Sequence, residues 1–209
     1  MLDVGAGTGT LATALAERAA CRVWAVEPSA AMLEIARRRV PRGVGLKHAR
    51  AEELPFRDGW FERAVARLVA HLVDRPRVFG ELHRVLGPGG RLVVATFDDS
   101  HFGTFWLNRF FPSLQEIDSA RFPRREDLRR ELEAAGFAGL RFERLSQRAQ
   151  LDRETALERI RGRYLSTFDL LPPDEVAAGT ARAEAELPER VEIALEWLLA
   201  VADRGADSK

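Results

Sequence analysis

Three glycines at alternate positions near the start of the chain constrain the fold more than any other feature. They stand in the segment Asp3-Val4-Gly5-Ala6-Gly7-Thr8-Gly9, between a short apolar run and the helical pattern that begins at Leu11. Glycine lets the backbone turn with a positive φ, and it lets a ligand lie against the main chain where a Cβ would block it. The succession of strand, glycine turn and helix predicts an α/β fold with a nucleotide-binding loop.

The spacing of the glycines distinguishes between kinds of nucleotide loop. A dinucleotide-binding loop has the pattern G-x-G-x-x-G, in which the third glycine allows close contact between helix and strand. In this chain the third glycine, Gly9, comes one residue earlier, and Thr10 stands where a dehydrogenase has glycine. A nicotinamide-dependent dehydrogenase is therefore a disfavoured alternative.

An acidic residue follows the next apolar run. Residues 21–26 are expected to form a buried second strand, which ends at Glu27 about twenty positions after the glycine loop. A carboxylate at that place can accept hydrogen bonds from both hydroxyls of a ribose. The alternative is a charge that flanks the following helix, because Pro28 and Ser29 are typical of a helix start.

Three segments carry a resemblance to one family. The Asp-x-Gly-x-Gly-x-Gly pattern resembles the cofactor loop of class I S-adenosylmethionine-dependent methyltransferases. Residues 81–91 resemble the Glu-x-x-Arg-Val-Leu-x-Pro-Gly-Gly-x-Leu segment of the ubiquinone-biosynthesis-type (methyltransferase type 11-like) members, and Leu54-Pro55-Phe56 matches a third segment. The resemblance covers the first five expected strands, which is about half of the chain.

The repeated strand-helix steps and the resemblance together define the expected fold. It is a Rossmann-like three-layer α/β sandwich whose seven-stranded sheet is mostly parallel. Later strands are expected at 44–48, 63–69, 91–97 and 140–145. Residues 188–203 are ambiguous by period, and the resemblance implies an antiparallel last strand there. We expect one methyltransferase domain over 1–209, with substrate-side helical elaborations at 98–123 and 151–187.

The resemblance also implies the cofactor, S-adenosylmethionine, and the residues that bind it. These are Asp3, Gly5, Ala6, Gly7, Gly9, Glu27, Pro28, Met32, Ala51, Glu52 and Arg67. The chain departs from the family pattern at Arg50, which replaces the acidic residue that often meets the adenine amino group. Because an arginine cannot accept a hydrogen bond, adenine recognition is expected to depend on the backbone of Ala51 and on Glu52.

The implied reaction is methyl transfer to a small-molecule acceptor by in-line displacement, in which an enzyme mainly positions the reactants about 3 to 3.5 Å apart. His71 is the candidate general base, and a structural histidine is the alternative. Phe102, Trp106, Arg163 and Tyr164 are candidate substrate residues, although helix packing or a surface role would also explain them. A non-catalytic cofactor-binding protein, or a degenerate methyltransferase, is the second functional hypothesis.

Composition excludes several other classes. Lysine plus arginine and aspartate plus glutamate both number 32, so the net charge gives no case for a nucleic-acid partner. Cys21 is the only cysteine, which excludes an internal disulfide and fits a cytoplasmic location. The histidines lack metal-ligand spacing, so no metal is expected. No stretch is apolar over enough residues to span a membrane. Oligomeric state stays open.

The start of the chain bears on the cofactor site. Members of the family usually have several dozen residues before the glycine strand, including helices that cover the cofactor. The resemblance therefore implies a chain shortened at its amino terminus, a start that is misassigned, or a protein in which the helices expected at 151–187 replace that cover.

Overall fold

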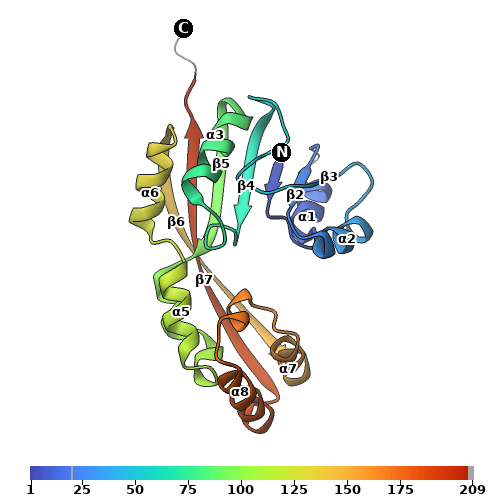
Figure 1. The fold of residues 1–209 in the computed structure, drawn as a ribbon, viewed down its shortest axis with the longest axis vertical. Coiled ribbons are helices and arrows are strands. Elements are labelled where there is room, and N and C mark those ends of the chain that lie inside the picture. Colours follow the sequence, from blue (N-terminus) through green and yellow to red (C-terminus); the bar gives the residue numbers. More distant parts are fainter. Residues whose placement is uncertain (20, 207–209) are drawn as a thin grey trace. The chain divides into compact units, whose positions relative to one another are not determined.

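A computed structural model, which describes residues 1–19 and 21–206, contains one seven-stranded sheet (Figure 1). Its strands are β1 (Leu2–Val4), β2 (Trp24–Glu27), β3 (Gly45–His48), β4 (Phe61–Arg67), β5 (Leu86–Phe97), β6 (Phe137–Asp152) and β7 (Arg190–Arg204). Their order across the sheet is β3-β2-β1-β4-β5-β7-β6. The first five strands pair in parallel and β7 is antiparallel, which confirms the expected Rossmann-like fold.

Helices lie between consecutive strands except β3 and β4, which are joined by a loop. The helices are α1 (Thr10–Arg18), α2 (Ala30–Arg39), α3 (Arg75–Val85), α4 (Asp99–Thr104), α5 (Ser113–Arg121), α6 (Arg125–Ala134), α7 (Arg153–Arg161) and α8 (Pro173–Glu186), with 3₁₀ turns η1 (Trp106–Arg109) and η2 (Ser166–Asp169). The strand β6 follows α6 directly. α2 begins as the sequence indicates, because the Ser29 hydroxyl accepts a hydrogen bond from the Met32 N–H at 3.3 Å.

The chain divides into two compact units. Among the described residues, unit 1 comprises 1–19, 21–96, 123–143 and 198–206, and unit 2 comprises 97–122 and 144–197. The helices expected between the sixth and last strands, α7 and α8, are present in unit 2. The two expected elaborations fall almost wholly within unit 2, and the assignment of the whole chain to one domain stays a prediction.

Each unit has its own apolar core. In unit 1, successive residues of a strand face opposite sides of the sheet, so Val26 belongs to the large core cluster that includes α3 and α6 residues, while Ala25 belongs to a separate cluster with the α1 residue Ala12. In unit 2, residues of η1, α5, α7 and α8 surround the buried rings of Phe111 and Phe168, whose centroids are 5.0 Å apart. The two clusters of unit 1 cover the two faces of its part of the sheet, as a mostly parallel sheet requires.

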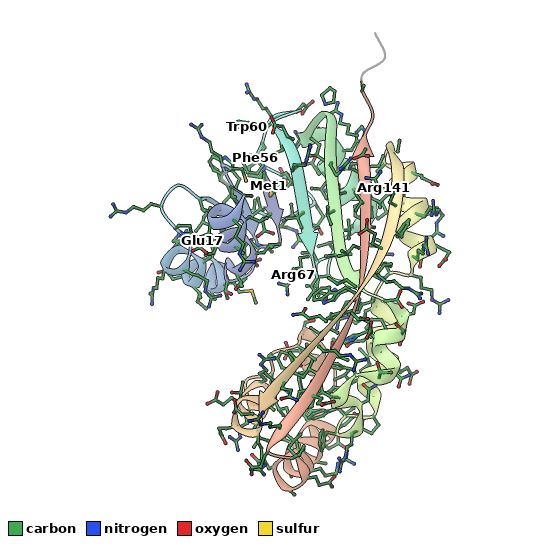
Figure 2. The ribbon with its side chains drawn as sticks, turned by 180° about the vertical axis from the view of Figure 1, so that it is seen from behind. Met1, Glu17, Phe56, Trp60, Arg67 and Arg141 are labelled. Carbon is green, nitrogen blue, oxygen red and sulfur yellow. The ribbon has the colours of Figure 1, made fainter. Side chains whose placement is uncertain are left out.

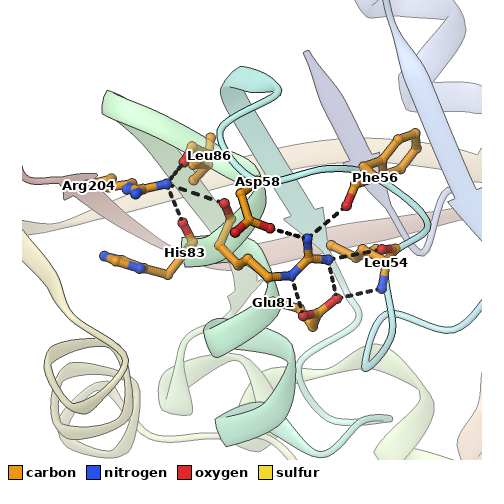
Figure 3. Close-up of polar contacts among 8 residues, drawn as sticks. Leu54, Phe56, Asp58, Glu81, His83, Leu86 and Arg204 are labelled. Carbon is orange, nitrogen blue, oxygen red and sulfur yellow. Dashed lines mark hydrogen bonds and ion pairs between the residues drawn. The ribbon is translucent and has the colours of Figure 1, made fainter.

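A hydrogen-bond network around Arg84 joins two of the family-like segments (Figure 3). Its guanidinium donates to Glu81 and Asp58, and to the carbonyl oxygens of Leu54 and Phe56 at 3.0 and 2.8 Å. Glu81 in turn accepts from the Leu54 N–H at 2.7 Å. The Glu-x-x-Arg pair of α3 therefore fixes the loop that follows β3.

The structure corrects two strand boundaries. Residues 87–90, which precede the strand expected at 91–97, form a bulge inside β5, where four residues oppose one residue of β4. Within the helical elaboration expected at 151–187, residues 153–169 are divided between α7 and η2. The sixth strand is also far longer than 140–145.

The break after α7 has a local cause. Arg163 adopts φ 48°, its N–H donates to the Ile160 carbonyl at 3.0 Å, and the Tyr164 N–H donates to the Arg159 carbonyl at 3.2 Å. This is a Schellman ending with arginine at the left-handed position that glycine usually occupies, while Gly162 stands one residue earlier. The helix therefore ends with Arg163 in the left-handed conformation, although glycine stands one residue earlier, at Gly162.

We expect Arg163→Gly to stabilise the protein by about 1 kcal/mol, because relief of the left-handed strain exceeds the entropy that glycine adds to the unfolded chain. Chemical denaturation measures the change. Arg163→Ala is the control, because it removes the 3.5 Å ion pair with Asp169 and keeps the strain. An equal gain in Arg163→Ala would contradict the assignment to backbone strain.

Candidate functional site

A cavity of about 490 Å³ opens at the carboxyl ends of the parallel strands in unit 1. Figure 2 shows Arg67 at this end of β4, opposite the edge where Met1 and Trp60 lie. The cavity is lined by Asp3, Gly5, Ala6, Gly7, Thr8, Thr10, Leu11, Val26, Glu27, Pro28, Ser29, Met32, Arg50, Ala51, Glu52, Arg67, Leu68, Val69, Leu72 and Val73. Ligands of open α/β sheets bind at this edge, next to the point where the strand order reverses.

The glycine loop forms one wall of the cavity. Gly5, Gly7 and Gly9 have φ values of 68°, 56° and 78°, the left-handed region that glycine adopts without strain. A Cβ on Gly5 would lie 2.2 Å from Val69 Cγ2, so glycine is required there for packing. Around Gly7 the nearest atom to such a Cβ would be Met32 Sδ at 3.9 Å, which leaves that backbone open to a ligand.

Glu27 joins the loop to the end of β2. The residue is 6% exposed, its Oε2 accepts from the Gly7 N–H at 2.8 Å, and its Oε1 accepts from the Ser29 N–H at 2.9 Å. A carboxylate offers about four acceptor positions, so two remain for a ligand after these backbone bonds are made. Glu27 can therefore hold the loop and accept from two ribose hydroxyls at the same time.

Asp3 is the most perturbed acid of the site. It is 1% exposed, it lines the cavity, and no hydrogen bond reaches its Oδ2 from the described residues. Burial raises the pKa of Asp3 to about 7, and the positive charge of Arg67 only partly opposes this rise. A buried acid with an unsatisfied oxygen is suited to a cationic or hydrogen-bond-donating ligand.

Arg50 and Glu52 form the wall after β3. Arg50 Nη2 lies 3.2 Å from Glu52 Oε1, which also accepts from the Asp74 N–H at 3.3 Å. Desolvation opposes ionisation of Glu52, but these donors outweigh it and lower the Glu52 pKa. Oε1 of Glu52 is thus already in use, and Arg50 offers only donors to an adenine base at this end of the cavity.

Leu68 lies in a strained conformation at the end of β4. Its φ is 54°, which costs a non-glycine residue free energy, and its N–H donates to the Ala95 carbonyl at 2.8 Å. The left-handed residue turns the chain so that the next side chain, Val69, covers Gly5. Residues 67–69 and the glycine loop therefore form one packed wall of the cavity.

The predicted cofactor residues lie together, with one difference. All of these residues line the cavity except Gly9. A Cβ on Gly9 would lie 2.7 Å from Val40 Cγ1, at the end of α2. The candidate base His71 is half-buried between the lining residues Val69 and Leu72 and is not itself one of them. Its catalytic role stays a prediction.

The four candidate substrate residues belong to unit 2. Phe102 is 4% exposed and packs against Phe97 and Phe122, as a core residue does. Trp106 lines a separate cavity of about 600 Å³ with residues of β6 and β7. Arg163 and Tyr164 lie in the exposed segment after α7. Their contact with a substrate also stays a prediction.

Sequence reasoning missed several lining residues. Thr8 and Thr10 alternate with the glycines and could have been found from that pattern. Leu68, Leu72 and Val73 carry no sequence signal, because they enter the wall only through the turn at Leu68. Among residues 1–19 and 21–206, no cluster of His, Cys, Asp or Glu could hold a metal ion, and no helix is long and apolar enough to cross a membrane.

The sheet order and the place of the cavity define a Rossmann-like nucleotide-binding protein. The model of a family described as "Methyltransferase domain" matches residues 2–94. A demethylmenaquinone methyltransferase of Thermus thermophilus is 36% identical over 170 residues, which cover 70% of this chain and 77% of that protein. A ubiquinone/menaquinone biosynthesis C-methyltransferase of Bordetella avium is 39% identical over 103 residues, covering 46% of this chain and 40% of that protein.

Solved structures agree with these matches. A protein of Anabaena variabilis, described as a methyltransferase from an antibiotic biosynthesis pathway, has a TM-score of 0.74 and 25% identity, over 95% of this chain and 88% of its own. The geranyl diphosphate C-methyltransferase of Streptomyces coelicolor, solved with S-adenosyl-L-homocysteine, shares the fold at a TM-score of 0.57 and 19% identity, over 97% and 70%. The chain belongs to the class I S-adenosylmethionine-dependent methyltransferases.

The residues present fit this cofactor. Glu27 has acceptor positions for a ribose, the open backbone at Gly7 admits a ligand, and Asp3 supplies a buried acid for a cation. S-adenosylmethionine is positively charged at its sulfur, and a buried acid in the cavity is electrostatically suited to a positively charged ligand.

Asp3 also predicts a pH dependence of stability. Because its pKa rises from 3.8 to about 7 on folding, the folded state binds the proton more tightly, and stability falls as the pH rises from about 4 to about 7. We expect Asp3→Asn to stabilise the ligand-free protein above pH 7, by up to roughly 1.4 kcal/mol for each pH unit crossed, and to have little effect near pH 4.

Thermal denaturation of both proteins between pH 4 and 8 measures this dependence. The control is Asp169→Asn, which makes the same chemical change at an exposed side chain. A stability difference between Asp3→Asn and the parent that stays constant over this range would contradict the raised pKa.

Proposed function

We propose that the chain transfers the methyl group of S-adenosylmethionine to a small organic acceptor by in-line displacement. The observation that carries the proposal is the Glu27 carboxylate, which is tied to the glycine loop and retains acceptor positions facing the cavity. The Thermus relative is named as a methyltransferase of demethylmenaquinone, which is a small molecule, and this name supports the choice of acceptor class.

The roles of the residues follow from their chemistry. Glu27 binds the ribose, and the glycine backbone lies along the cofactor. Asp3 and Arg67, on neighbouring strands, provide opposite charges for the ends of an amino acid group. Bound cofactor supplies an electrophilic methyl carbon, so the protein need only orient the acceptor and exclude water. His71 is the candidate base for acceptors that must lose a proton.

The proposal covers the setting as well as the reaction. The balanced charge and single cysteine lead us to propose a small-molecule partner and a cytoplasmic location, with no nucleic acid involved.

Incubation with labelled S-adenosylmethionine and a panel of quinols, phenols and amines tests the reaction. Lack of transfer to every acceptor by a protein that binds the cofactor would favour the non-catalytic alternative.

Glu27 gives the direct test of the cofactor site. We expect Glu27→Ala to weaken S-adenosylhomocysteine binding by roughly 1.5 to 3 kcal/mol, because two hydrogen bonds to ribose are lost. Glu27→Gln retains one acceptor oxygen and should lose less. Isothermal titration calorimetry measures both variants, and unchanged affinity in Glu27→Ala would remove the ribose role.

The side chain of Arg50 leads to a prediction about recognition of the adenine base. Since Arg50 cannot accept a hydrogen bond from the 6-amino group, we expect the analogue of S-adenosylhomocysteine that carries purine instead of adenine to bind within about threefold of the parent ligand. Arg50→Asp should restore a preference of roughly tenfold for adenine. Arg42→Asp, on an exposed loop outside the cavity, controls for the change of charge.

A further inference from the structure

Arg39, in the last turn of α2, makes an unusual set of contacts with the glycine loop. Its Nη1 donates to Thr10 Oγ1 at 2.6 Å, to Thr8 Oγ1 at 2.8 Å and to the Thr8 carbonyl oxygen at 3.4 Å. Thr8 and Thr10 line the cavity, whereas Arg39 does not. Arg39 therefore contacts the cavity only indirectly, through hydrogen bonds to two threonines that line it.

Helix electrostatics do not explain where this guanidinium lies. A cation is favourable at the carboxyl end of α2, but Arg37 and Arg38 share that advantage and pair with Glu34 instead. Arg39 is placed at the first residue of α1, where the positive end of the helix dipole disfavours a cation. Its position is accounted for by the hydrogen bonds to the loop.

The loop needs such a support. Glycine has more backbone freedom to lose than any other residue, and three glycines stand within five positions. From β2, the loop is held by the Val26 carbonyl and by Glu27, which bind residues up to Gly7. From α2 and the residue after it, the loop is held by the packing of Ala36 and Val40 on Gly9 and by the hydrogen bond from Arg39 to Thr8.

We propose that Arg39 is a positioning residue, which holds the segment from Gly7 to Thr10 in the conformation that binds the cofactor without touching the cofactor itself. The inference rests on the proposed function, because the loop conformation matters only if the cofactor lies there. A loop that is ordered before binding loses less entropy when the ligand binds, so removing the support weakens affinity.

The experiment compares Arg39→Met, which keeps the length and apolar stem of the side chain, with Arg38→Met. Arg38 is the neighbouring residue, is 80% exposed and contacts Glu34. Calorimetry with S-adenosylhomocysteine should show a loss of about 5- to 20-fold for Arg39→Met and of less than about twofold for Arg38→Met. Arg39→Lys keeps a cationic donor and should recover part of the loss.

Hydrogen exchange of the ligand-free protein gives a second readout. The Gly9 N–H, which donates to the Ala6 carbonyl at 2.9 Å, should exchange at least about fivefold faster in Arg39→Met than in Arg38→Met. Affinity and exchange equal to those of the parent would overturn the proposal. A lowered melting temperature with unchanged affinity would also overturn it, since Arg39 would then only join two helices.

The two proposals can fail separately. If the parent protein does not bind S-adenosylhomocysteine, the proposed function fails, while the exchange rate of the Gly9 N–H still decides whether Arg39 orders the loop. If the parent binds and Arg39→Met binds equally well, only the positioning role fails.

Discussion

The site depends on one buried carboxylate that is shared between two segments of backbone. Glu27 accepts from the N–H groups of Gly7 and Ser29, and so it fixes the glycine loop and the start of α2 at the end of β2. A buried charge is tolerated only when such donors satisfy it, and its loss would leave both N–H groups without an acceptor. The loop, the strand and the helix are therefore ordered together around a group that also faces the ligand.

The sequence was sufficient where local chemistry decides the structure. The glycine spacing placed the loop, because each of the three glycines adopts a positive φ. The apolar runs and their turn residues predicted the first six strands, and the resemblance resolved residues 188–203 as β7, where helical and strand periods compete. Ser29 began its helix as predicted. Such features need no knowledge of distant contacts, and the Rossmann-like fold followed from them.

The remainder depends on contacts between residues far apart in sequence. Leu68 takes a glycine-like conformation in which its own N–H donates to the Ala95 carbonyl and its neighbour Val69 lies against Gly5, and no residue pattern indicates this. The β5 bulge depends on register with β4, and Arg163 ends α7 in a position where glycine would be expected. The division into two units likewise emerges from packing, since long strands run through ranges of both.

The contact between Val69 and Gly5 has a mechanical consequence. If Leu68 relaxed to an ordinary extended conformation, the side chain of Val69 would leave Gly5, and the wall between them would open. Conversely, the glycine loop cannot shift toward β4 unless Val69 withdraws. The segment after β4 and the glycine loop are therefore mechanically coupled. Relief of the backbone strain at Leu68 would require both segments to move.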